Sequence, residues 1–230
     1  MHNDQEALII ECGCPYSQCL RAIGFNRKKI VGAIVTHEHG DHAKFVSQYL
    51  DAAIPVFASQ GTIDGFNIRN DGRKAIPVQC KKPFKVGKFT ILPFDTKHDS
   101  NEPFGYVISH PEIGCCLFAT DTYYLKYVFG GLTQIMLECN YENGIIEKNV
   151  EDGVIPPIVR DRVFRSHMSL DTTISTLRAN DLSQVNNIVL LHLSGNNSNP
   201  ELFTRRVEEA TGKVVHIAKR GLDISFDKEL

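Results

Sequence analysis

The most constraining feature of this chain is a run of metal-binding side chains placed directly after an apolar strand. Residues 29–36 are apolar and β-branched, which is typical of a strand buried on both faces, and segment 37–42 reads His-Glu-His-Gly-Asp-His. In an extended chain His37 and His39 point the same way. A helix that starts at Asp41 directs the side chains of Asp41 and His42 towards a second metal site. Imidazole and carboxylate groups suit zinc, and also manganese or iron.

One such run does not complete two metal sites, so further ligands must come from other strand ends. His98 follows a predicted strand that ends near Phe94, Asp121 follows a predicted strand at 116–119, and His192 follows one at 188–191. A lone His or Asp after a strand is more often a loop or turn residue. The run at 37–42 favours the metal-ligand interpretation for all three.

The rest of the pattern predicts a mixed α/β chain. Short strands are expected at 7–10 and 55–58, with helical spacing at 41–50 between them. Turn signals predict hairpins at 84–92 and 106–119. Strands at 134–138 and 187–191 then alternate with helices at 170–180 and 200–211, before closing strands at 214–217 and 222–226. Ser169 and Asn199 are the predicted N-caps of the two helices. This mixture indicates two sheets with helices outside them.

Composition excludes several classes of protein. Lys and Arg number 25 against 27 Asp and Glu, so no global basic excess indicates nucleic-acid binding, although a local patch remains open. No apolar run approaches a membrane span, and the polar first residues predict that there is no signal peptide. Seven cysteines, an odd number, favour reduced thiols, no disulfide and a cytoplasmic location. A structural metal cluster at Cys12, Cys14 and Cys19 is the less favoured alternative.

The order His-x-His-x-Asp-His, His, Asp, His resembles the metallo-β-lactamase superfamily over essentially the whole chain. The resemblance implies an α/β fold in a single domain, 1–230, with an αββα four-layer sandwich of two mixed β-sheets and helices on the outer faces. It also implies two divalent metals, most readily Zn²⁺, whose shared water has a lowered pKa and yields hydroxide near neutral pH. The implied ligands are His37, His39 and His98 for the first metal, Asp41, His42 and His192 for the second, and Asp121 as the bridge. Glu11 stands where the superfamily normally has Asp, and is implied to orient the metal loop.

Motifs at 11–13, 36–39, 138–141, 166–169, 192–197 and 217–222 look like the YycJ/WalJ branch, which is related to ribonuclease Z and associated with DNA exonuclease activity. Ribonuclease Z-like enzymes use a Glu and a His that hand a proton to the leaving oxygen, and Glu138 and His167 match those positions. The implied catalytic residues are therefore Asp41, Glu138 and His167. Candidate phosphate contacts are Ser194, Asn196, Asn197 and Arg165. The branch usually begins with an extra strand and a Gly/Ser-rich loop, and this chain is expected to lack both.

Three functions remain open at this point. The first is a two-metal phosphodiesterase that acts on nucleic acid, with DNA favoured over RNA and no membrane partner. The second is a small-molecule hydrolase of thioesters, lactones or β-lactams, against which the Glu138 and His167 pair argues. The third is a non-catalytic metal-binding protein, which the complete ligand set disfavours.

Overall fold

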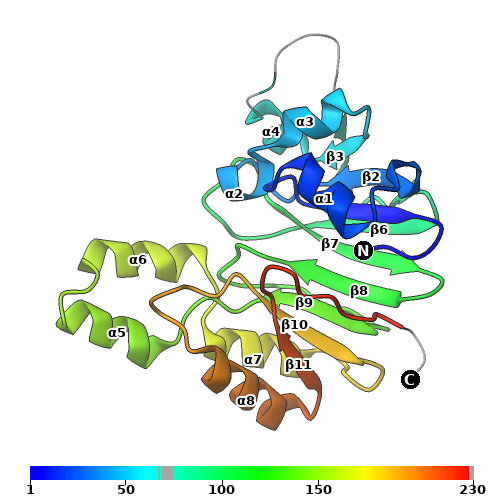
Figure 1. The fold of residues 1–230 in the computed structure, drawn as a ribbon. Coiled ribbons are helices and arrows are strands. Elements are labelled where there is room, and N and C mark those ends of the chain that lie inside the picture. Colours follow the sequence, from blue (N-terminus) through cyan, green and yellow to red (C-terminus); the bar gives the residue numbers. More distant parts are fainter. Residues whose placement is uncertain (67, 69–74, 228–230) are drawn as a thin grey trace. The chain divides into compact units, whose positions relative to one another are not determined.

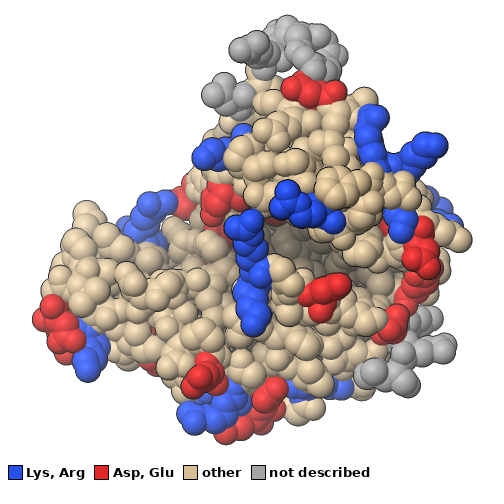
Figure 2. All heavy atoms as spheres, viewed as in Figure 1, with Lys and Arg blue, Asp and Glu red and all other residues tan. Residues whose placement is uncertain are grey.

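The computed structural model describes residues 1–66, 68 and 75–227, which divide into two compact units. The first unit comprises Met1–Asp95 and Ser100–Tyr106, and the second comprises Thr96–Asp99 and Val107–Leu230 (Figure 1). On the face drawn in Figure 2, Lys and Arg lie interspersed with Asp and Glu. Within the described part of the chain, every helix is too short or too polar to cross a membrane.

A parallel sheet forms the framework of the first unit. Its strand order is β1-β2-β3-β4, and β1 and β2 pair with Ile10 opposite Ile34. Parallel strands in this register end at the same edge of the sheet, so the residues after β1 and after β2 emerge together. The sheet strands are β1 (Ala7–Ile10), β2 (Ile30–Ile34), β3 (Val56–Ala58) and β4 (Ile76–Pro77).

The first unit also contains short helices and the predicted hairpin. The helices are α1 (Tyr16–Ala22), η1 (Arg27–Lys29), α2 (Gly40–Ala43), α3 (Val46–Asp51) and α4 (Gln60–Asp64). The hairpin pairs β5 (Phe84–Val86) antiparallel with β6 (Phe89–Asp95), as the Gly87-Lys88 turn predicts. The chain then enters β7 (Phe104–His110), which starts in the first unit and ends in the second.

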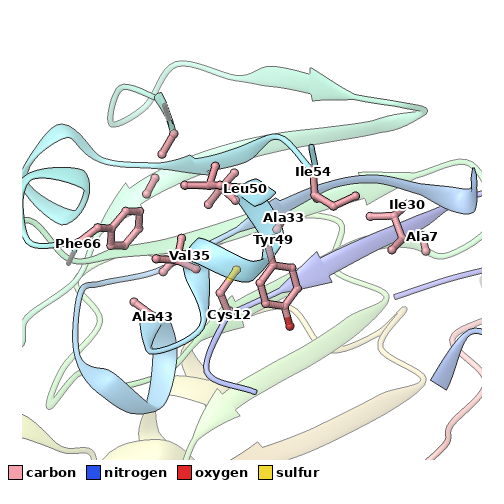
Figure 3. Packing of buried hydrophobic residues seen from close by; sticks show 14 residues of the cluster. Ala7, Cys12, Ile30, Ala33, Val35, Ala43, Tyr49, Leu50, Ile54 and Phe66 are labelled. Carbon is pink, nitrogen blue, oxygen red and sulfur yellow. The ribbon is translucent and has the colours of Figure 1, made fainter. Parts of the chain in front are cut away.

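The core of the first unit is formed by the helices and the parallel sheet. Tyr49 and Leu50 from α3 pack in one cluster with Ala33 and Val35 from the β2 segment, and Cys12 lies beside the Tyr49 ring (Figure 3). The helix expected at 41–50 is instead two helices. The break falls at Phe45, whose N–H bonds to the Cys12 carbonyl at 3.0 Å rather than to the preceding helical turn.

The second unit is built on four parallel strands. These are β8, β9, β10 and β11, which pair in that order. The strand β7 lies next to β8 in the same sheet. These strands are almost wholly apolar, as expected of strands that are covered on both faces. Phe203 and Val207, both fully buried, come from one of the helices that cover the sheet. The elements are β8 (Gly114–Ala119), β9 (Gln134–Glu138), α7 (Leu170–Ala179), β10 (Asn187–Leu191), α8 (Pro200–Thr211) and β11 (Val214–Ile217).

Two local predictions in this unit have opposite outcomes. The caps at Ser169 and Asn199 are confirmed, because each side chain accepts a hydrogen bond from the first turn of its helix. The closing strand predicted at 222–226 is wrong. Gly221 has a left-handed φ of 82°. Where a strand ladder was expected, the side-chain amide of Asn187 donates to the Ser225 carbonyl, and that of Asn186 donates to the carbonyl of Asp227, just beyond the segment.

A pair of helices that the sequence did not predict projects from the second unit, α5 (Asn143–Glu151) and α6 (Pro157–Ser166) (Figure 1). Tyr141 and Phe164 stack with their ring centroids 5.3 Å apart, and Ile146 is fully buried between the helices and the chain that enters them. Arg160 of α6 bonds to Glu147 of α5 at 3.0 Å. The pair is therefore held by its own small apolar cluster and an ion pair.

Gly13→Ala is expected to destabilise the first unit. A Cβ at residue 13 would lie 1.6 Å from the backbone oxygen of Asp41, and the neighbouring bond from the Cys12 N–H to the His42 oxygen, 2.7 Å, leaves little room for either segment to move. We expect a loss of about 2–3 kcal/mol in the free energy of unfolding, measured in urea. Gly130→Ala, where a Cβ meets nothing within 4 Å, is the control. Equal losses in the two variants would contradict the steric explanation.

Candidate metal centre

The first unit gathers three of the predicted imidazoles at the edge where β1 and β2 end. The rings of His37 and His39 lie 4.6 Å apart, and those of His37 and His42 lie 4.1 Å apart. Asp41 approaches His42, with Oδ2 3.4 Å from Nε2. Glu11, at the end of β1, places Oε1 3.4 Å from His42 Nδ1. The structure therefore brings together the predicted ligands of this unit and the acid predicted to orient them.

Thr36, which sequence reasoning did not single out, links Glu11 to His37. Its hydroxyl donates to Glu11 Oε1 at 2.6 Å, so its one proton is already used. The contact of 2.9 Å between Thr36 Oγ1 and His37 Nδ1 is then a bond donated by the imidazole. The neutral His37 ring is thereby held as the Nδ1–H tautomer, and its Nε2 carries the lone pair that a metal requires.

The separation of ring nitrogens in this cluster fits a metal ion. His37 Nε2 and His39 Nδ1 lie 3.1 Å apart. Two nitrogens bound to one tetrahedral zinc at about 2.0–2.1 Å lie roughly 3.3 Å from each other. Glu38, the other carboxylate of the motif, has a different task, because its Oε1 accepts the Asn101 N–H at 2.8 Å and its stem packs on Gly65.

The second unit gathers its own cluster where the parallel strands β8, β9 and β10 end. In the β9–β10 register Leu191 lies opposite Glu138, so the residues after these strands share one edge. One ligand atom from each of four side chains lies within 4.8 Å of the others, namely from Asp121, Glu138, His167 and His192. His192 Nδ1 lies 3.3 Å from Asp121 Oδ1 and 3.2 Å from Glu138 Oε1.

Glu138 has no exposed side-chain surface, and its two oxygens are both occupied. Oε2 accepts the Thr122 N–H at 2.6 Å, and Oε1 lies 2.7 Å from His167 Nδ1. Since an ionised carboxylate only accepts, His167 donates from Nδ1, and its Nε2 is left for other work. The structure thus brings together the predicted pair of Glu138 and His167, in the orientation that a general acid requires.

His98 belongs to the second unit and is held by the end of α6. Its Nδ1 lies 3.0 Å from the carbonyl oxygen of Ser166, which only accepts, so Nδ1 carries the proton. Nε2 then directs a lone pair towards carboxylate oxygens, at 3.3 Å from Asp99 and 3.8 Å from Asp121. Burial lowers the pKa of His98 and favours this neutral form. A lone pair that faces carboxylates is an arrangement that a cation between them stabilises.

The candidate phosphate contacts differ in their exposure to solvent and in their hydrogen bonds. Arg165 is exposed on the last turn of α6, and Asn196 is exposed in the loop before α8. Asn197 is buried, its carbonyl accepts the Glu142 N–H at 2.9 Å, and its Oδ1 accepts from Asn149 at 2.8 Å. Ser194 Oγ accepts the Asn197 N–H at 3.3 Å. Asn197 therefore fastens this loop to α5, which sequence reasoning had not foreseen.

A family model of the β-lactamase superfamily domain matches residues 17–193. The chain belongs to this superfamily and has the metallo-β-lactamase fold, as the order of its ligands predicted. It is a metal-dependent hydrolase of that fold, and the fold and donor groups together imply divalent metal binding.

Three individual proteins are similar to this chain over most of its length. The chain is 25% identical over 223 residues to the exodeoxyribonuclease YycJ of Bacillus anthracis, with 90% of this chain and 81% of that protein covered. The metallo-β-lactamase fold protein YhfI from Bacillus subtilis matches with a TM-score of 0.71 at 16% identity, over 96% of this chain and 88% of that one. The short form of human tRNase Z matches with a TM-score of 0.62 at 15% identity, over 98% and 90% of the two chains. The two structural matches bear on the fold alone.

Glu138→Gln is expected to reverse the tautomer of His167. The Thr122 N–H keeps the amide oxygen as its acceptor, so the new NH₂ group faces His167 Nδ1 and donates to it. Nitrogen chemical shifts of labelled histidine should report Nδ1–H in the native protein and Nε2–H in the variant. The same tautomer in both proteins would show that Glu138 does not set it.

Proposed function

We propose that this protein is a dinuclear metal-dependent phosphodiesterase, and more particularly a DNA exonuclease. The observation that carries the proposal is the 2.7 Å contact between the buried Glu138 carboxylate and His167 Nδ1, within a cluster that also holds Asp121 and His192. The similarity to an exodeoxyribonuclease supports DNA as the substrate. The fold shared with a tRNase Z keeps RNA as the alternative substrate to be tested.

In this proposal the metal ligands are distributed as the superfamily resemblance implies. His37, His39 and His98 hold one ion, Asp41, His42 and His192 hold the other, and Asp121 is shared. Support comes from the tautomers of His37 and His98, since hydrogen bonds to Thr36 and Ser166 leave a lone pair on each Nε2. When bound, divalent metals, most readily Zn²⁺ with Mn²⁺ or Fe²⁺ as alternatives, supply a Lewis acid and a nucleophile near neutral pH.

The protein's own contribution is a positioned proton. Cleavage of a phosphodiester releases an alkoxide, which is a poor leaving group until it is protonated. His167 holds Nδ1–H on Glu138 and, in its protonated form, offers Nε2–H to that oxygen. General acid catalysis of this kind is worth roughly 10²–10⁴-fold. The proposed phosphate contacts are Arg165, two residues before His167, and Ser194 and Asn196 in the loop between β10 and α8.

A cytoplasmic location is part of the same proposal. It is supported by the seven cysteines, an odd number that favours reduced thiols.

His167→Ala should separate substrates by their leaving groups. We expect the variant to retain its metals but to cleave DNA about 10²–10⁴-fold more slowly, because the alkoxide leaves without a proton. An activated aryl phosphodiester, whose leaving group needs no proton, should slow much less. His216→Ala, which removes an imidazole on β11 outside the cluster, is the matched control. Equal losses on both substrates would exclude a general acid role for His167.

Removal of metal should abolish activity reversibly. Chelation followed by gel filtration should give inactive protein, and added Zn²⁺ or Mn²⁺ should restore cleavage of single- or double-stranded DNA ahead of RNA. Elemental analysis should find two equivalents of metal per native chain and fewer in Asp121→Ala, which lacks the shared ligand. Full activity in demonstrably metal-free protein would refute the proposed chemistry, while preferential cleavage of RNA would overturn only the choice of DNA.

A further inference from the structure

Two thiols of the first unit lie in contact with each other and are not used by the proposed catalysis. Cys14 Sγ and Cys19 Sγ are 3.6 Å apart. Cys14 precedes α1 and Cys19 lies on it, and both side chains are half-buried. The hydroxyl of Tyr49, a buried residue of α3, lies 2.9 Å from Cys19 Sγ and 3.7 Å from Cys14 Sγ. The three groups form a small cluster of thiols around one phenol.

The hydrogen bonds of Tyr49 distinguish the two sulfurs. Its single proton is donated to the Cys14 carbonyl at 2.9 Å, so Cys19 keeps its own proton and shares it between the Tyr49 oxygen and Cys14 Sγ. Cys19 is thereby held as a thiol. The hydrogen bond with Cys19 lowers the pKa of Cys14 to about 6, and the same contact raises the pKa of Cys19. A thiolate is the reactive form of cysteine, so Cys14 is the nucleophile of the pair.

We propose that Cys14 and Cys19 are an oxidation site that forms a reversible disulfide when the protein meets a hydroperoxide. The Cys14 thiolate attacks the O–O bond of hydrogen peroxide, forms a sulfenic acid and releases hydroxide, which takes a proton and leaves as water. The Cys19 thiol then attacks the sulfenic sulfur, loses its proton and releases a second water. Two thiols are oxidised and one peroxide is reduced.

The geometry permits this bond with little rearrangement. Disulfide sulfurs lie about 2.05 Å apart, so the present contact closes by a short movement of two half-buried side chains. Burial raises the pKa of the three fully buried thiols, those of Cys12, Cys116 and Cys139.

The test treats the intact protein with hydrogen peroxide and alkylates it in denaturant before and after reduction. We expect a mass loss of two hydrogen atoms, with Cys14 and Cys19 blocked until dithiothreitol is added. Cys80 and Cys115, which are also half-buried, serve as internal controls and should remain open to alkylation. Alkylation of Cys14 and Cys19 after peroxide, under conditions that oxidise free glutathione, would overturn the proposal.

Two matched variants assign the roles. In Cys19→Ser the reaction should stop at the sulfenic acid of Cys14, which dimedone traps as an adduct. In Cys14→Ser no adduct should form on Cys19, because its proton is held by Tyr49. Circular dichroism verifies that each variant is folded. An adduct on Cys19 together with none on Cys14 would overturn the assignment, and the native protein tests the disulfide without any variant. Neither result depends on the proposed nuclease activity.

Discussion

The second unit is organised around a carboxylate that has no access to water. Glu138 ends the strand β9 with its side chain fully buried, and an ionised carboxylate in such a place is costly unless it is paired and hydrogen-bonded. Its partners come from three directions, the Thr122 N–H after β8, His192 after β10, and His167 between α6 and α7. Satisfying one buried anion therefore fixes the positions of the side chains to which the chemistry is assigned.

Backbone strain occurs at candidate site residues in both units. Glu11, Asp121 and His192 have left-handed φ values of 69°, 50° and 55°, which residues other than glycine rarely adopt. Each follows directly or closely on a strand, and the left-handed turn sends the chain out of the strand while the side chain stays at the edge of the sheet. Such conformations cost about 1–3 kcal/mol each, and they persist where surrounding contacts over-determine them. Here the strand before each residue is held by a parallel neighbour, β1 by β2, β8 by β9, and β10 by β9 and β11.

The sequence was informative where a signal is local. An apolar strand followed by a polar run predicted β2 and the imidazoles at 37–42, and strand ends predicted Asp121 and His192. It was uninformative for α5 and α6, because these helices contribute only Ile146 and Ser166 to buried positions and so show little amphipathic pattern. The broken helix at Phe45 depends on a carbonyl of Cys12, distant in sequence. Thr36 was within reach of sequence reasoning, as a hydroxyl directly before the first histidine, whereas the role of Ser166 lies in its backbone and leaves no trace in residue type.

That backbone role of Ser166 limits how related proteins can diverge. The carbonyl at the end of α6 is one that a helix leaves without an internal partner, and the His98 ring takes it, while the next residue is His167. One helical turn thus orients two imidazoles. The turn between α5 and α6 is far from these rings, and residues in and beside it, such as Val154 and Ile158, are exposed. The turn can therefore change in length and in residue type. A deletion within α6 would rotate its last turn and misalign both rings at once. Homologues should therefore differ in the turn between α5 and α6 and keep the last turn of α6.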